Sequence, residues 1–232
     1  MRTTRDRLRA AGVPLRHLDC SFANFLPREG TEQALNVAVQ WAREATSGRG
    51  LALLGPPGCG KTHILVASLR DRMELLDAER LRDEAIAEAD PERVRHRPLW
   101  RPAFRVVPVM LDDLRASMRL QTTDAEEDFR YLRDDADLVV LDDLGTEKPS
   151  DWVVSRLFAL VEKRYGDMRA TCVTSNLSLD QLADNGYRSL VSRLTETCDI
   201  VTLNAGDMRP QKGRATVTDG MASVGAHGAR YQ

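Results

Sequence analysis

LALLGPPGCGKT, residues 51–62, decides the fold, because it places four apolar residues directly before a complete G-x-x-x-x-G-K-T loop. The glycines let the backbone curl so that its N–H groups point inward at a β-phosphate, and the positive end of the following helix adds to this field. Lys61 is expected to reach the β- and γ-phosphates, and the Thr62 hydroxyl to ligate Mg²⁺. The stretch therefore predicts an ATP site, whose expected binding residues are Gly55, Pro56, Pro57, Gly58, Cys59, Gly60, Lys61, Thr62 and His63.

A second motif follows downstream in LVVLDDL, residues 138–144, where four apolar residues end in two aspartates. A short apolar, β-branched run of this kind is typical of a buried parallel strand. We expect Asp142 to hold Mg²⁺, directly or through water, and Asp143 to orient and polarise the attacking water. The alternative interpretation is an acidic strand-to-helix turn. Because glutamate is commoner at the second position, the shorter Asp143 predicts slow hydrolysis.

Asn176 is the polar residue that closes the next expected strand, in VTSN, residues 173–176. Its amide is suited to hydrogen bonding with the γ-phosphate or the lytic water, which would make it a catalytic residue. Asn is also favoured as a local turn cap, and this alternative stays open on sequence grounds.

The remaining pattern alternates strands with helices, which predicts a parallel sheet flanked by helices and a ligand site at the carboxyl ends of its strands. We expect helices over residues 31–45, from 62 to about 89, over 111–120 and over 150–165. Strands are expected over residues 51–54, 104–110, 138–141 and 170–174. The fold class is thus α/β, a P-loop NTPase.

Bulk properties exclude several classes of protein. The formal net charge is -2 and the pI is about 6.1, so nucleic-acid binding would need a local basic patch. The four cysteines show no C-x-x-C spacing, which disfavours a zinc ribbon or a disulfide framework and fits a reducing compartment. No apolar run reaches the roughly 18 residues of a membrane span. We expect a cytoplasmic protein without membrane contact.

Five segments together resemble one family: GPPGCGKTH, LVVLDDLGTEKPSDW, LFALVEKRY, VTSNLSLDQL and VSRL. They are similar to the bacterial replicative helicase loaders of the DnaC and DnaI type, with the IstB-like transposition ATPases as relatives, all of the AAA+ class. The resemblance covers roughly residues 14–210, and GTEKP is its most discriminating piece. It implies an AAA+ fold with little or no C-terminal lid domain.

The resemblance also assigns roles to two arginines. Arg193, in VSRL, matches the family's arginine finger, which stabilises the transferring phosphoryl group at a neighbouring subunit's nucleotide. The alternative is a surface arginine paired with Glu196. Arg209, in GDMR, resembles the second sensor arginine that contacts bound nucleotide. A finger acting in trans implies a homo-oligomer with a shared ATP site.

Domain boundaries follow from composition and from the resemblance. We expect a basic N-terminal arm over residues 1–27 that docks through Phe22 and Phe25, an AAA+ ATPase domain over 28–210, and a disordered tail over 211–232. Loaders of this type usually carry a helicase-binding region ahead of the core, which we do not expect here. The charged insertion, residues 77–105, is either a solvated helical extension or a docking element.

The resemblance implies a replicative helicase and single-stranded DNA as partners, with Arg115, Arg119, Arg70 and Arg72 as candidates for phosphate contact. Two alternatives remain open. One is an IstB-like regulator whose partner is a transposase, and the other is a nucleotide-gated scaffold with little turnover.

Overall fold

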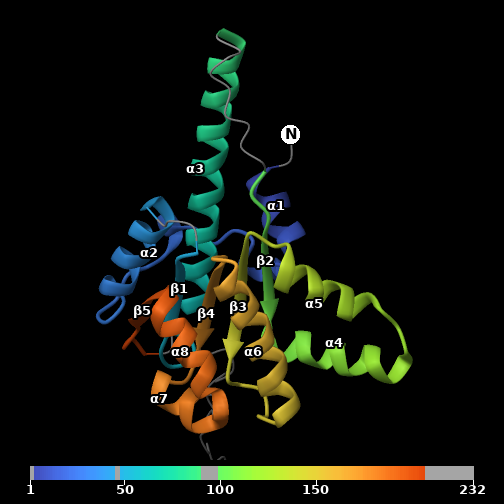
Figure 1. Ribbon diagram of the computed structural model, residues 1–232. Helices are drawn as coiled ribbons and strands as arrows, with labels where there is room; N and C mark the ends of the chain where they lie inside the picture. Colours follow the sequence, from blue (N-terminus) through green and yellow to red (C-terminus); the bar gives the residue numbers. More distant parts are fainter. Residues whose placement is uncertain (1–2, 45–47, 90–98, 207–232) are drawn as a thin grey trace, which may run out of the picture.

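A computed structural model describes residues 3–44, 48–89 and 99–206, and its centre is a five-stranded parallel sheet (Figure 1). The strand order is β2-β3-β4-β1-β5, and every pairing is parallel. The strands are β1 (Gly50–Leu54), β2 (Pro102–Val106), β3 (Leu138–Leu144), β4 (Ala170–Ser175) and β5 (Cys198–Thr202). Because all strands run the same way, their carboxyl ends meet at one edge of the sheet.

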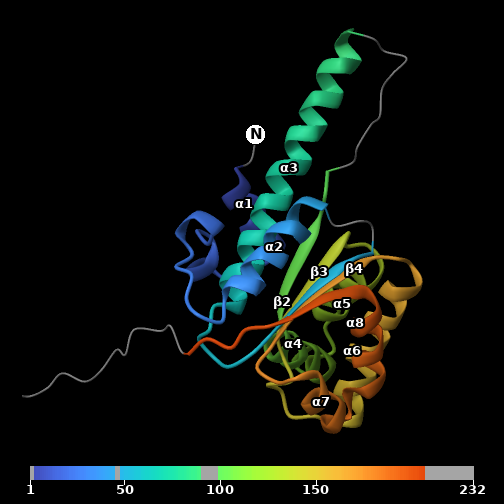
Figure 2. The ribbon, with the colours of Figure 1, turned by 90° about the vertical axis from the view of Figure 1, so that its left-hand side faces the viewer.

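Helices cover both faces of the sheet, as the edge-on view in Figure 2 shows. One face carries α1 (Thr4–Ala11), α2 (Glu32–Glu44) and α3 (Lys61–Ala89). The other carries α4 (Val107–Leu120), α5 (Asp124–Asp134), α6 (Asp151–Gly166), α7 (Leu179–Leu182) and α8 (Arg188–Thr197). Alternation along β1 explains the two cores: Leu51 and Leu53 pack with the first group, and Ala52 packs with the second.

The sequence expectation of a parallel α/β fold is confirmed, although helices α1, α5, α7 and α8 were not among those expected and two strands also differ. The strand expected over residues 104–110 ends at Val106, because α4 begins at Val107 and places Pro108 in its first turn. Proline is tolerated there, since the first helical N–H groups need no intrahelical partner. The edge strand β5 was missed because its sequence, CDIVT, has only a short apolar run.

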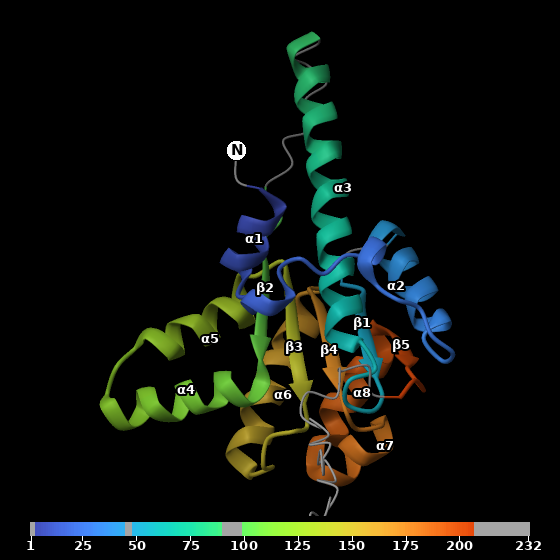
Figure 3. The same ribbon diagram turned by 180° about the vertical axis from the view of Figure 1, so that it is seen from behind.

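The N-terminal segment contributes more to the core than two phenylalanines. Phe25 is buried and Phe22 packs against the core, but Leu8 of α1 and Leu18 are fully buried as well. A capping box at Thr3 starts α1, and Gly12 ends it in a left-handed conformation. The segment therefore packs along α3 and beside the edge strand β2 (Figure 3).

The charged insertion divides into helix and strand. Residues 77–89 continue α3, which projects beyond the sheet (Figure 1), and β2 begins at Pro102. Residues 90–98 of the insertion and the expected tail, 211–232, lie outside the described residues. In the part of the chain that is described, no helical domain follows β5. No helix in the described ranges is both long and apolar enough to span a bilayer.

Arg164 of α6 holds the loops at the amino ends of β3 and β4, although its side chain is fully buried. Its guanidinium donates to the carbonyls of Leu132, Ala136 and Ala170 at 2.7–2.8 Å, and Nε donates to the Thr171 hydroxyl at 3.2 Å. Burial lowers the pKa of Arg164 to about 10, so the side chain stays charged at neutral pH. One cation thus satisfies several buried carbonyls.

Replacing Arg164 with methionine should therefore lower the free energy of unfolding by about 3–5 kcal/mol, because the carbonyls lose their donors. Urea unfolding followed by circular dichroism measures the change. The matched control is Arg119→Met at an exposed position on α4, expected to change stability by less than about 0.5 kcal/mol. Equal losses in the two variants would contradict the bracing role.

Candidate nucleotide-binding site

The glycine-rich loop between β1 and α3 has the backbone that a phosphate cradle requires. Gly55, Gly58 and Gly60 have φ values of +140°, +75° and +102°, a region that side chains disfavour. A Cβ on Gly55 would lie 2.2 Å from the Leu203 carbonyl oxygen, so this position also needs glycine for space. Cys59 is buried beneath the loop, whereas Pro56 and Pro57 are exposed.

Lys61 connects the loop with the end of β4. The side chain is 5% exposed, and Nζ donates to the carbonyls of Gly55 and Pro56 at 2.7 and 2.8 Å and to Asn176 Oδ1 at 2.8 Å. Burial lowers the pKa of Lys61, while the nearby carboxylates of Asp143 and Asp142 favour its charged form. The geometry brings two predicted site residues, Lys61 and Asn176, into direct contact.

Asp142 lies at the centre of the site and is only 3% exposed. Its Oδ1 accepts hydrogen bonds from the Thr62 hydroxyl at 3.0 Å and the Thr174 hydroxyl at 2.6 Å. Burial raises the pKa of Asp142, although both hydroxyls oppose this shift. A buried carboxylate beside a hydroxyl is a donor set that suits Mg²⁺, whose charge would offset the desolvation. The predicted pair of metal ligands, Thr62 and Asp142, therefore fits a divalent cation.

Asp143 adopts an unusual backbone conformation, with φ at +60°. Its N–H donates to the Thr174 hydroxyl at 2.9 Å, and the pairing of β3 with β4 shifts register between Leu141 and Leu144. Left-handed conformations of non-glycine residues cost free energy and cluster at functional sites. The sequence did not predict a role for Thr174; only its place near the end of β4 could have indicated one.

A cavity of about 490 Å³ opens beside these residues, and the N-terminal segment forms part of its wall. The lining residues are Arg16, His17, Asn24, Phe25, Leu26, Gly58, Gly60, Lys61, Thr62, His63, Asp143 and Asn176. His63 Nε2 lies 3.0 Å from Asn24 Oδ1, and its ring meets Phe25 edge-on at 5.2 Å. Burial, with the charges of Arg16 and His63, lowers the pKa of His17 to about 4, so its imidazole is neutral at pH 7.

No motif in the sequence predicts the part of the cavity wall that the N-terminal segment forms. Residues such as Asn24 and Phe25 precede the glycine-rich loop by about thirty positions and carry no recognisable spacing of their own. The stretch nevertheless packs against α3, the helix that starts at the loop. Tertiary packing, rather than a motif, brings it to the site.

Arg193 does not line this cavity among the described residues. It lies on α8, where Nε donates to Glu162 Oε2 at 2.6 Å and the guanidinium sits 4.4 Å from the centre of the Tyr165 ring. Nη1 is 3.9 Å from Glu196, the partner considered above. Arg209, the other predicted arginine, lies outside the described residues.

The four arginines considered for phosphate contact differ in their surroundings. Arg70 donates to the Leu18 and Cys20 carbonyls, and Arg72 lies 3.4 Å from the Ala42 carbonyl oxygen, so both hold backbone inside the domain. Arg115 pairs with Asp112 at 3.0 Å and stacks on Trp152, next to exposed Arg119. Arg115 and Arg119 are therefore the pair on an accessible surface.

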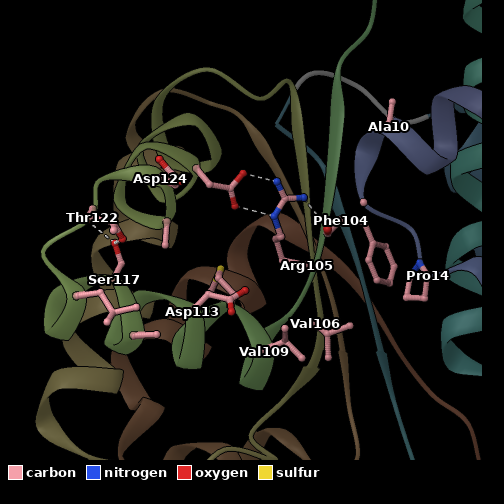
Figure 4. Close-up of a pocket in the computed structure, with 16 residues that line it drawn as sticks. Ala10, Pro14, Phe104, Arg105, Val106, Val109, Asp113, Ser117, Thr122 and Asp124 are labelled. Carbon is pink, nitrogen blue, oxygen red and sulfur yellow. Dashed lines mark hydrogen bonds and ion pairs between the residues drawn. The ribbon is translucent and has the colours of Figure 1, made fainter.

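A second cavity, of about 780 Å³, lies between β2, α4 and α5 (Figure 4). Arg105 points across it and pairs with Asp128. This ion pair also joins the edge strand β2 to α5. Neither the glycine-rich loop nor the two strand-end aspartates line it. This cavity is separate from the candidate nucleotide site.

The strand order, the loop between β1 and α3 and the acidic end of β3 together define an AAA+ P-loop fold. Solved structures agree: the DnaC helicase loader superposes with a TM-score of 0.62 at 22% identity, covering 82% of this chain and 100% of that one. The DnaI structure gives 0.62 at 21% identity, covering 85% and 95%. The predicted AAA+ fold of DnaC and DnaI type is confirmed.

The chain is also similar to a replication initiator of known structure and to a protein of similar sequence. A DnaA replication initiator bound to AMPPCP and single-stranded DNA superposes with a TM-score of 0.60 at 16% identity, covering 84% of this chain and 52% of that one. The Escherichia coli K12 protein YdaV, described only as uncharacterised, is 25% identical over 192 residues, 81% of this chain. The chain spans 66% of YdaV. No protein-family model matches.

Replacing Asp142 with asparagine should stabilise the nucleotide-free protein at pH 7, since an amide keeps an acceptor for both hydroxyls and removes the buried charge. Because the folded-state pKa is raised, the wild-type protein binds its proton more readily when folded. The loss of stability that the buried charge causes in the wild type therefore shrinks as the pH falls toward 3.8, the pKa of aspartate in the unfolded chain. Urea midpoints at pH 7 and pH 4 measure this, with Asp180→Asn at an exposed position of α7 as control. A lower midpoint for Asp142→Asn at pH 7 would contradict the burial argument.

Proposed function

We propose that the chain binds and hydrolyses ATP as a DNA replication protein, a loader of a replicative helicase that works on single-stranded DNA. One observation carries the proposal: Lys61, Asp142, Asp143 and Asn176 converge beside the glycine-rich loop in a fold shared with DnaC and DnaI. The loop binds phosphates, and the cavity beside it has room for the nucleoside.

Each residue of the site has a distinct task in this proposal. The loop N–H groups and Lys61 hold the phosphates, and Lys61 exchanges its carbonyl partners for phosphate oxygens. Thr62 and Asp142 hold Mg²⁺, which supplies charge neutralisation when bound. Asp143 orients the attacking water, and Asn176 bonds the γ-phosphate or that water. His17 and Phe25 flank the nucleoside, and the neutral imidazole adds no charge there.

The described residues that line the site include no arginine from α8, and the finger in this proposal comes from a neighbouring copy. Arg193 would leave Glu162 to reach the phosphates of the adjacent subunit. Its ion pair is about one-third exposed, so solvent screening makes the exchange inexpensive. Hydrolysis then depends on assembly, which a loader can use as a timing signal. Arg209 remains a candidate second sensor.

The DNA and helicase partners rest on the fold comparisons and on surface chemistry. The DnaC structure is that of a helicase loader, and the DnaA structure contains single-stranded DNA. Arg115 and Arg119, on the accessible face of α4, supply cationic groups beside Trp152 for phosphate and base contact.

The proposal predicts that single-stranded DNA stimulates ATP hydrolysis by the full chain. Arg193→Ala should bind a fluorescent ATP analogue normally and lose stimulated hydrolysis by at least about 100-fold, because arginine fingers contribute a factor of about 10³–10⁵. Lys61→Ala should bind the analogue far more weakly. Arg188→Ala, at the start of α8, is the matched control. Normal analogue binding by Lys61→Ala would overturn the nucleotide site. A pull-down with the full chain tests the loader function, and capture of a transposase instead of a replicative helicase would overturn that function.

Thr174→Val tests the hydroxyl between the two aspartates. It removes the acceptor for the Asp143 N–H and a donor to Asp142, so hydrolysis should fall by about 10-fold while the affinity for ATP changes little. Steady-state kinetics measure kcat and KM separately. Thr202→Val, at an exposed position of β5, should behave as the wild type. An unchanged kcat for Thr174→Val would show that Asp143 needs no such support.

A further inference from the structure

A buried hydrogen bond connects the turn after β3 with the start of α8. The Tyr187 hydroxyl donates to Glu147 Oε1 at 2.6 Å, and the Gly145 N–H reaches both oxygens of the same carboxylate at 3.0 and 3.1 Å. Glu147 is 8% exposed and Tyr187 1% exposed. Burial and the adjacent carboxylate raise the pKa of Tyr187, so its hydroxyl remains a donor at all physiological pH values.

Glycines with a left-handed backbone lie on both sides of this bond, and one of them is closely packed. Gly145 has φ at +85°, and a Cβ there would lie 2.7 Å from Leu182 Cδ2 and 2.9 Å from Leu177 Cδ1. The turn is therefore pressed against the segment that contains α7. Gly186, with φ at +94°, redirects the chain immediately before Tyr187. The hydrogen bond thus joins a closely packed turn to a residue that directly follows a left-handed glycine.

In the proposed function, each of the two segments carries a residue that acts at a different ATP site. The turn begins at Asp143, which lines the nucleotide cavity, and α8 carries Arg193 six residues after Tyr187. Buried Leu190 and Leu194 anchor α8 to the core beside α6. A shift of the turn would consequently be passed to α8 through a charged hydrogen bond in a dry environment, where such bonds are strong.

We propose that Glu147 and Tyr187 are positioning residues that set α8, and with it Arg193, relative to the turn that carries Asp143. The inference rests on the proposed function, in which Arg193 acts on the neighbour's nucleotide while Asp143 acts on its own. The link then ties together two successive ATP sites of an assembly. Neither residue touches the nucleotide.

The test mixes two inactive variants of the full chain. Lys61→Ala donates fingers but lacks a nucleotide site, and Arg193→Ala offers sites but lacks fingers, so their mixture hydrolyses ATP only at mixed interfaces. Tyr187→Phe placed in the finger donor should lower kcat by about tenfold at unchanged KM. The same change in the site donor should alter kcat by less than about twofold.

Controls separate positioning from loss of structure. Tyr131→Phe on α5, placed in the finger donor, should leave kcat unchanged, and urea unfolding verifies that each variant folds. Glu147→Gln provides a second variant, because the amide accepts the tyrosine hydroxyl more weakly. It should lower kcat by about threefold, again only in the finger donor.

Two outcomes overturn different claims. If Tyr187→Phe or Glu147→Gln lowers kcat equally in both donors, or in neither, the positioning role is wrong. If the unmodified mixture shows no ATP hydrolysis beyond that of its separate components, the shared site of the proposed function is wrong instead.

Discussion

Asp142 carries a carboxylate into the interior of the protein, where an ion without partners costs several kcal/mol. Two hydroxyls meet this cost in part, Thr62 from the start of α3 and Thr174 from the end of β4. Three elements that are distant in the sequence are thereby fixed around one oxygen atom. The Thr174 hydroxyl also receives the Asp143 N–H and so supports the left-handed backbone that directs Asp143 into the cavity. These hydrogen bonds organise the centre of the site.

Among the described residues that line the site, none is an arginine of the chain's own α8. In the isolated chain Arg193 stays with Glu162 and Tyr165, on a helix whose first turn is tied to the Asp143 turn through Tyr187 and Glu147. In the function that we propose, the arginine that accelerates hydrolysis and the carboxylate that orients the water come from different subunits, so the rate of hydrolysis would depend on neighbouring copies. We therefore interpret the site as one whose hydrolysis is controlled by assembly.

Sequence alone could predict the phosphate loop, the acidic strand end and the parallel sheet, because each depends on residue type at short spacing. Lys61 and Asn176 were each predicted to lie at the site, because parallel strands end at one edge of the sheet, but their direct hydrogen bond was not predicted. Thr174 and the wall formed by Asn24 and Phe25 could not be found, since a single hydroxyl or aromatic ring has no local signature. The strand expected over residues 104–110 was extended too far, because the place of Pro108 in a first helical turn is known only once the helix start is known.

The central claim is that hydrolysis needs two copies of the chain, and the most direct measurement is the initial rate of ATP hydrolysis per subunit as a function of protein concentration. With ATP and single-stranded DNA saturating, our account predicts that the rate per subunit rises with concentration and then saturates as copies assemble. For Arg193→Ala it should stay near zero throughout. A wild-type rate per subunit that is constant down to concentrations at which sedimentation shows only monomers would contradict the account.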